Sequence, residues 1–315
     1  SETAEPQAES PSESPSESQP PRERRGGGRG GPQGRPQRRP PSAKVFVEGR
    51  YRKLVRDLPQ TVFFCPECKG HPRRRKGCAR CEGYGKLTRD SVQELVGWVA
   101  GRAFGTRKHK FHGAGREDVD VRMLGRGRPF VLELVDPKVL DVDLAALEAE
   151  INRRNEGRLE IEGLHWTERT RVRYLKETPH AKLYRALVET SEPLDPAAAA
   201  ALLGRRIEVV QKTPERVAHR RAELDRPRWI ELQAFERAAG DETGRRFEVR
   251  LATQHGTYVK EALSGEGGRT TPSLAELLGA RCTCLELDVV EILGAEEDPA
   301  APRRGPPTFG AGLGE

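Results

Sequence analysis

Two closely spaced pairs of cysteines constrain the fold of this sequence more than any other feature. In the segment CPECKGHPRRRKGCARCEGYGK, nine residues separate the pair Cys65 and Cys68 from the pair Cys78 and Cys81. Four thiolates at this spacing are typical of a tetrahedral zinc site, in which the metal supplies folding energy to a short, loop-rich segment. Because four protein ligands leave no position open for a substrate, we expect a structural rather than a catalytic zinc ion.

Two disulfides or four free thiols are the alternatives to a zinc site. The first residues, SETAEPQAES, do not show a basic segment followed by an apolar one, so we expect a cytoplasmic rather than a secreted chain. Disulfides are rare in such a compartment, and the pairing of the cysteines argues against isolated free thiols. No stretch approaches the roughly 18 apolar residues that cross a bilayer, so we expect no membrane segment.

Composition divides the chain into four parts. Residues 1–44 are nearly all Ser, Pro, Glu, Gln, Gly and Arg and have no apolar periodicity, which predicts a disordered tail whose second half is rich in Arg and Gly. Residues 45–90 form an N-terminal segment that carries the four cysteines. Residues 91–295 have the composition of the main globular domain, and residues 296–315, rich in Gly, Pro and Ala, predict a flexible tail.

Positive charge is concentrated next to the cysteines. The whole chain has 55 Lys and Arg against 48 Asp and Glu, and this net charge of +7 points only weakly to a polyanionic partner. Residues 69–89, however, contain eight basic residues and the single acid Glu82. Such a surplus attracts phosphates and makes binding depend on salt, although a solvated basic surface is the alternative.

Helical and extended patterns alternate irregularly along the main domain. Helices are predicted after Ser91, at 143–155, at 195–204 and at 273–280, where Ser, Asp or a Ser–Glu capping pair precedes an apolar stripe. The segments RFEVRLAT, LELDVVEIL and AKLYRALVET have the period of two that indicates strands. We therefore expect an α+β fold with a mixed, largely antiparallel sheet. Cys282 and Cys284 fall on one face of a predicted strand, where we expect buried core residues rather than metal ligands.

A glycine-flanked loop, FHGAGREDVDVRMLGRGRPF at residues 111–130, holds charges of both signs before the aliphatic run VLELV. An ordinary polar hairpin is one interpretation, and an acidic residue held by arginines in an anion-handling site is the other. A metal-dependent phosphatase or nuclease would need further carboxylates or histidines, and a glycosidase would need a second carboxylate that nothing identifies. A phosphate-binding Walker A loop is absent from the sequence.

The loop also carries a resemblance that extends over most of the chain. GRED resembles the motif around the catalytic aspartate of pseudouridine synthases, KLYRALV their strand motif with a lysine and a tyrosine, and GTYVKEAL their GTYIR-type motif. Together with GRYRKLVRDLPQT, QKTPERVAHRR and GGRTTPSLAELLGA, these segments make residues 46–295 similar to the archaeal and eukaryotic tRNA pseudouridine synthases of the tenth Pus family. That family has an RNA-binding THUMP-type region ahead of GRYRKLVRDLPQT, whereas the low-complexity tail occupies this place here.

The resemblance implies a pseudouridine-synthase fold and a role for each matching residue. Asp118 would be the catalytic carboxylate, which in the family either attacks the ribose anomeric carbon or removes the C2′ proton. Lys260 would be its ion-pair partner, Tyr184 would stack on the flipped uracil and Tyr258 would line the pocket. Arg116 would lie near the vacated position or bind phosphate, and Lys182 would contact the RNA backbone. Without the resemblance, both tyrosines would be interpreted as core strand residues and Lys260 as a surface charge.

The implied function is isomerisation of uridine to pseudouridine in the tRNA T-loop, at position 54, position 55 or both. The resemblance implies no organic cofactor, tRNA as the partner through its T-arm, and no obligate protein partner, so that a monomer is expected. The alternative is a non-catalytic zinc-ribbon protein that binds RNA and retains the fold. These two hypotheses differ in whether the chain makes pseudouridine at all.

Overall fold

The structure is a computed structural model that describes residues 43–218, 222–294 and 305. The predicted tails at 1–44 and 296–315 lie almost entirely outside the described residues. Within the described part, no helix is long and apolar enough to cross a membrane.

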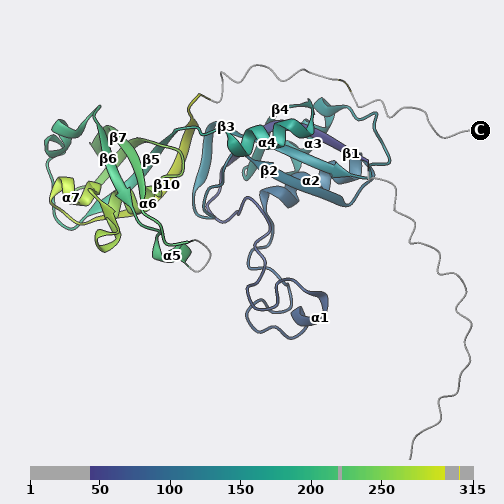
Figure 1. Ribbon diagram of the computed structural model, residues 1–315, viewed down its shortest axis with the longest axis horizontal. Helices are drawn as coiled ribbons and strands as arrows, with labels where there is room; N and C mark the ends of the chain where they lie inside the picture. Colours follow the sequence, from purple (N-terminus) through teal and green to yellow (C-terminus); the bar gives the residue numbers. More distant parts are fainter. Residues whose placement is uncertain (1–42, 219–221, 295–304, 306–315) are drawn as a thin grey trace, which may run out of the picture. The chain divides into compact units, whose positions relative to one another are not determined.

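Ten strands of the described residues form one sheet, in the order β4-β1-β3-β10-β5-β8-β7-β6-β9, with β2 paired to β3. Figure 1 labels most of these strands. The strands are β1 (Lys44–Lys53), β2 (Lys108–Gly113), β3 (Arg122–Val135), β4 (Leu159–Thr167), β5 (Lys182–Thr190), β6 (Arg206–Gln211), β7 (Arg226–Arg237), β8 (Arg246–Thr253), β9 (Thr270–Thr271) and β10 (Cys282–Ile292). All strand pairs are antiparallel except β3 with β10. The predicted class, α+β with a mixed and largely antiparallel sheet, is confirmed.

The helices are short and begin mostly where the sequence provides a cap. They are α1 (Pro72–Arg75), α2 (Val92–Ala103), α3 (Leu144–Arg154), α4 (Arg169–Glu177), η1 (Pro196–Leu202), α5 (Glu215–Ala218), α6 (Val259–Ser264), η2 (Glu266–Gly268) and α7 (Leu274–Leu278). The side chains of Ser91, Asp143 and Ser273 accept hydrogen bonds from the first turns of α2, α3 and α7, as predicted. The predictions of these three helices are confirmed.

The helix predicted at 195–204 is a 3₁₀ helix rather than an α-helix. Asp195 caps it through the backbone N–H of Ala197, as predicted, but the segment must end where Leu203 bridges Leu232 of β7. A 3₁₀ helix rises about 2.0 Å per residue against 1.5 Å for an α-helix, so seven residues cover a longer span to reach that bridge.

Strands β5, β8 and β10 coincide with the three segments predicted from their period of two. In β10 both cysteines pack on the main core, with Cys282 buried and Cys284 half-buried, so the prediction of core residues is confirmed. The parallel pair of β3 and β10 is short, because it aligns only Arg122 with Asp288 and Met123 with Val289.

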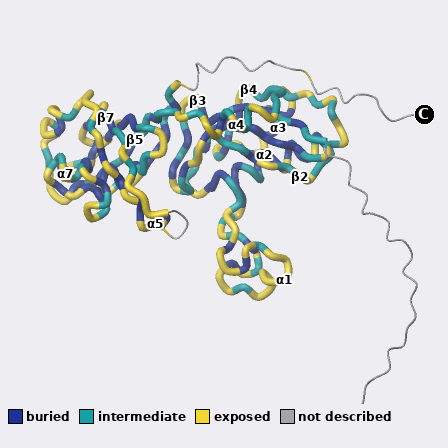
Figure 2. Tube along the Cα trace, in the orientation of Figure 1, coloured by how far each residue is buried: buried dark blue, intermediate teal, exposed yellow. Residues whose placement is uncertain are grey.

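The main core joins apolar residues from most of the strands and from α2, α3, α6 and α7. A separate small cluster consists of the cysteines of the 64–86 loop, which Figure 2 shows as largely exposed around α1. Strand β1 pairs with β3 on one side and β4 on the other, so residues 44–53 belong to the sheet although the sequence grouped them with the cysteine segment. The predicted domain boundary at residue 90 stays a prediction. Before it, β1 belongs to the sheet, and only the loop holds the separate cysteine cluster.

Candidate active site

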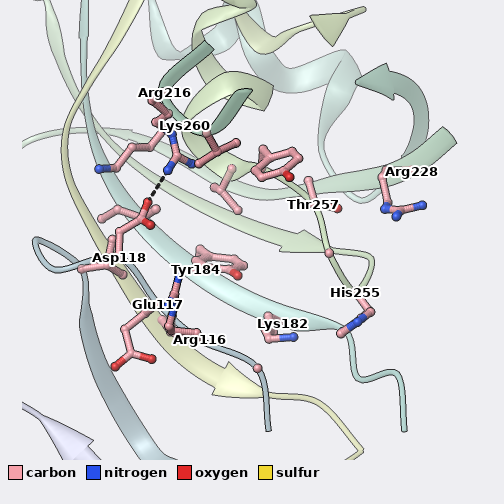
Figure 3. A pocket seen from close by; sticks show the side chains of 18 of the residues that line it. Arg116, Glu117, Asp118, Lys182, Tyr184, Arg216, Arg228, His255, Thr257 and Lys260 are labelled. Carbon is pink, nitrogen blue, oxygen red and sulfur yellow. Dashed lines mark hydrogen bonds and ion pairs between the residues drawn. The ribbon is translucent and has the colours of Figure 1, made fainter. Parts of the chain in front are cut away.

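The GRED loop, residues 114–121, connects β2 to β3. A pocket of about 420 Å³ opens where this loop, β5 and the start of α6 meet (Figure 3). The volume falls within the range of small-ligand sites. All six substrate-site residues predicted from the sequence line it, namely Arg116, Asp118, Lys182, Tyr184, Tyr258 and Lys260. Residues that are up to 144 positions apart in the sequence, from Arg116 to Lys260, therefore share one cavity.

The carboxylate of Asp118 pairs with an arginine that the sequence analysis did not select. The Nη1 atom of Arg216, on α5, lies 2.8 Å from Oδ2 of Asp118, and its Nε lies 2.6 Å from Oε1 of Glu261 on α6 (Figure 3 draws the first contact). Glu261 is nearly buried, so the guanidinium is held at one end by an enclosed acid and presents its other end to Asp118. The side chain of Asp118 keeps 39% of its surface exposed toward the cavity and solvent.

The prediction that Lys260 forms an ion pair with Asp118 is wrong. The Nζ atom of Lys260 lies 2.6 Å from Oδ2 of Asp120, two residues further along the loop. Because Arg216 already contacts Asp118 while reaching Glu261, Lys260 neutralises the next acid instead. Lys260 still lines the pocket, and its contact lowers the pKa of Asp120 against the opposing effect of burial.

Glu117, the residue before Asp118, anchors the GRED loop to the protein interior. The carboxylate of Glu117 is buried, with its Oε2 atom 2.9 Å from Nε of Arg128, and accepts hydrogen bonds of 2.9 Å from the hydroxyl of Tyr51. Arg128, itself 1% exposed, donates to the carbonyl of Ala114, and Gln60 donates to the carbonyl of Gly115 and to the Tyr51 hydroxyl. The sheet register explains this meeting, because Tyr51 of β1 lies opposite Arg128 of β3.

A buried lysine fixes the backbone of Asp118 itself. The Nζ atom of Lys53 donates to the carbonyls of Leu58, Asp118 and Val119 at 2.8, 3.0 and 3.0 Å. Burial lowers the pKa of Lys53 from 10.5 to about 8, although the neighbouring acids act in the opposite direction. Lys53, Tyr51 and Gln60 all belong to GRYRKLVRDLPQT, a segment that supported the family resemblance without receiving roles.

A second buried acid stabilises the short contact between β3 and β10. Asp288 is 2% exposed and accepts hydrogen bonds from Arg56, Arg122 and Arg185 at 2.8 to 3.0 Å. Burial alone would raise the pKa of Asp288, but the three guanidinium groups hold it below its usual value. Arg56 also donates to the carbonyl of Asp120, which connects the end of the GRED loop to β10.

Two tyrosines face the same cavity from different elements. Tyr184 lies on β5 opposite Val289 and Leu251, and its burial raises the phenol pKa to about 12. Tyr258 is at the N-cap of α6 rather than in a strand, and its ring has the guanidinium carbons of Arg216 and Arg226 at 5.9 Å. The buried amide of Gln211 fixes Tyr258 by accepting from its N–H and donating to its carbonyl, both at 2.9 Å.

The far wall of the pocket is cationic. Lys182, Arg226, Arg228 and His255 line it, and burial together with Arg128 lowers the pKa of Lys182 to about 8. Burial lowers the pKa of His255 as well, with a further contribution from Lys182 and Arg228. His255 received no role from the sequence, because the isomerisation that the resemblance implies needs no histidine. This wall suits an anionic ligand such as a nucleotide phosphate.

The four cysteines converge within their own loop. Their sulfur atoms all lie within 4.8 Å of one another, with Cys65 to Cys78 at 3.8 Å and Cys68 to Cys81 at 3.6 Å. Sulfurs around a tetrahedral zinc ion at about 2.3 Å lie roughly 3.8 Å apart, whereas a disulfide needs about 2.05 Å. The residues present therefore fit a four-thiolate metal site, and the disulfide alternative does not fit.

The family model described as Pus10, C-terminal, matches residues 46–293. The chain belongs to the Pus10 family. The chain is 44% identical to the tRNA pseudouridine synthase Pus10 of Korarchaeum cryptofilum, over 80% of this chain and 66% of that protein. It is 43% identical to the Pus10 of Methanocaldococcus jannaschii, over 79% of this chain and 53% of that protein. The chain thus spans between about half and two thirds of the length of these Pus10 relatives.

Two solved structures are also similar. A Cbf5-Nop10-Gar1 complex aligns over 62% of this chain and 44% of that chain, with a TM-score of 0.35 and 19% identity. An archaeal box H/ACA sRNP Nop10-Cbf5 complex aligns over 78% of this chain and 57% of that chain, with a TM-score of 0.32 and 16% identity.

Proposed function

We propose that the chain is a tRNA pseudouridine synthase that isomerises uridine at position 54, position 55 or both in the T-loop. One observation carries the proposal: Asp118 stands in a cationic pocket together with both tyrosines that the resemblance assigned to the uracil. The names of the Pus10 relatives support the same activity. In this proposal residues 91–295 form the catalytic domain. Strand β1, which precedes them in the sequence, is part of the same sheet.

In this proposal each group acts on a flipped uridine. Asp118 is the catalytic carboxylate, and Arg216 supplies its counter-charge at 2.8 Å. Tyr184 and Tyr258 flank the uracil, while Lys182 and Arg116 bind the RNA backbone. The glycosidic bond to N1 breaks, the uracil turns, and a bond from the ribose to C5 forms while a proton leaves C5 and N1 gains one. Attack on the anomeric carbon and removal of the C2′ proton both start from this arrangement.

The proposal also specifies the cofactor and the partners. The isomerisation involves no net oxidation or reduction, so it includes no organic cofactor, and the four cysteines hold a structural zinc ion. The partner is tRNA through its T-arm. No obligate protein partner is included, and the chain acts as a monomer in the cytoplasm.

Conversion of a T-loop transcript tests the proposal. Wild-type protein and Asp118→Asn are incubated with unmodified tRNA, and pseudouridine is mapped chemically. We expect product at one or both T-loop positions with the wild type and none with the variant, because the amide can neither attack nor accept a proton. Binding without any product from the wild type would favour the non-catalytic RNA-binding alternative, and an active Asp118→Asn would overturn the assignment of the carboxylate.

A further inference from the structure

The cysteine loop carries an unusual set of exposed aromatic rings. Phe63, Phe64 and Tyr84 are 43%, 56% and 74% exposed, and Trp98 on neighbouring α2 is 50% exposed. Within the part of the chain that the structure describes, every other aromatic side chain is buried or half-buried. Exposed apolar groups gathered in one place mark interaction sites on soluble proteins.

Three of these aromatic residues, Phe63, Phe64 and Trp98, lie at or beside the base of the loop. Phe64 forms a bridge with Lys86, the N–H of Leu87 donates to the carbonyl of Phe63, and the Lys86 ammonium lies 5.7 Å from the centre of the Trp98 ring. Lys86 also pairs with Glu94 of α2, which connects the loop base to that helix. The aromatic groups at the loop base are therefore placed by backbone and ionic contacts rather than by a hydrophobic core.

The same loop also carries several exposed basic side chains. Exposed cations in or beside the loop for which no ion pair is found in the described residues are Lys69, Arg73, Arg74, Arg75, Lys76 and Arg89. The run of three arginines is fixed as one helical turn, α1, whose first turn is capped by His71. The aliphatic part of the Arg75 side chain lies close to Gly85, the residue after Tyr84, so α1 packs against the backbone that carries this exposed tyrosine.

We propose that the loop of residues 63–89, with Trp98, is a second RNA-binding surface that stacks unpaired bases on Tyr84 and contacts phosphates through its arginines. An acidic protein would satisfy the charge but would leave the exposed rings of the loop unused, whereas single-stranded nucleotides use both. The zinc site fixes the loop that presents these groups, and the pocket at Asp118 is a different site. The inference rests on the proposed function in taking the substrate tRNA as the RNA.

Binding of full-length protein to a tRNA transcript tests this surface separately from turnover. We expect Tyr84→Ala to weaken the Kd about 5- to 150-fold, in line with the loss of one stacked base, and Tyr84→Phe to bind like the wild type. Arg73→Gln with Arg74→Gln should reduce the slope of log Kd against log salt by roughly 1 per arginine. The matched control, Arg173→Gln with Arg205→Gln, removes two exposed arginines outside the loop and should leave both quantities unchanged.

The outcomes separate this proposal from the proposed function. Loop variants that keep wild-type affinity and salt dependence while the wild type makes pseudouridine would overturn the surface alone. A wild type without product, but with binding that the loop variants weaken, would overturn the proposed activity and support the surface. A polyglutamate competitor that displaces the tRNA as well as an equal charge of RNA would identify a general polyanion or acidic-protein site, and would overturn the assignment to RNA. Retained zinc content in each variant confirms that the loop is folded.

Discussion

At the scale of single residues, the charges of the GRED loop have separate partners although they are adjacent in sequence. Glu117 turns inward to the buried Arg128, Asp118 faces Arg216, and Asp120 pairs with Lys260. The alternation places one acid in the interior and leaves its neighbours at the pocket. The loop is therefore anchored by Glu117, beside the proposed catalytic carboxylate, so Asp118 does not anchor the loop to the interior and faces the pocket.

The identity of the cation that serves Asp118 is testable. We expect Arg216→Gln to slow single-turnover pseudouridine formation about 100-fold, because it removes the counter-charge of the reacting carboxylate. Lys260→Gln should slow it less than about 5-fold, since it removes a pair whose acid is 62% exposed and such pairs contribute little. Arg173→Gln, at an exposed ion pair with Glu177, is the control. A larger loss of rate with Lys260→Gln than with Arg216→Gln would instead identify Lys260 as the functional partner of Asp118.

Burial of Lys182 predicts a pH dependence of stability. Its pKa is about 8 in the folded chain against 10.5 for an unperturbed lysine, so between these values the unfolded chain binds more protons. Stability then rises with pH across this window, because the cost of burying the ammonium is present below pH 8 and is relieved above it. Relative to Lys182→Met, the unfolding free energy of the wild type should increase by about 3 kcal/mol from pH 8 to 10.5.

Urea denaturation of both proteins at several pH values measures this difference. The comparison with Lys182→Met cancels the contribution of Lys53, which has a similar pKa and is present in both proteins. A difference that stays constant with pH would show that Lys182 is solvated in the folded chain.

At the scale of elements, local signals could be predicted and long-range ones could not. The helices that were predicted, α2, α3 and α7, each start at a side-chain cap that is visible in the sequence. Among the helices that were missed, α4 and α6 follow the N-cap residues Glu168 and Tyr258, which make no side-chain cap, so their stability comes from packing that the sequence does not display. The other missed helices, α1, α5 and η2, have only three or four residues. Strand pairing was likewise not predictable. Strand β1 belongs to the sheet, although the sequence analysis placed its residues in the N-terminal segment that carries the four cysteines.

The same limit applies to the site. Motif resemblance identified the six predicted pocket residues, because each matches a motif position to which the family assigns a role. The supporting residues are Lys53, Gln60, Arg128 and Arg216. Lys53 and Gln60 donate to backbone carbonyls. Arg128 pairs with Glu117, 11 residues away, and Arg216 with Asp118, 98 residues away. A hydrogen bond to a carbonyl can be made by many side chains, so it leaves no distinctive residue pattern to read.

Taken as a whole, the described residues contain one extended core, a small apolar cluster around Ala114, Val131 and Leu175, and a cysteine cluster that is separate from both. The core unites strands from both sides of the β3 and β10 contact, whereas the cysteines pack only on one another. The base of the loop is closed by two backbone hydrogen bonds, from Cys65 to Gly85 and from Leu87 to Phe63. The stability of the loop and that of the sheet should therefore be separable.

Metal removal tests this separation. Chelation under reducing conditions should accelerate amide hydrogen exchange in residues 63–87, because the loop has no apolar core to replace the metal. Exchange in β1, β3 and β5 should stay slow, since their protection comes from the main core. Cys65→Ser with Cys68→Ser should give the same pattern without a chelator, and Cys284→Ser, outside the cluster, should not. Faster exchange throughout the sheet would instead show that the metal stabilises the whole fold, and unchanged exchange in the loop would argue against a structural metal.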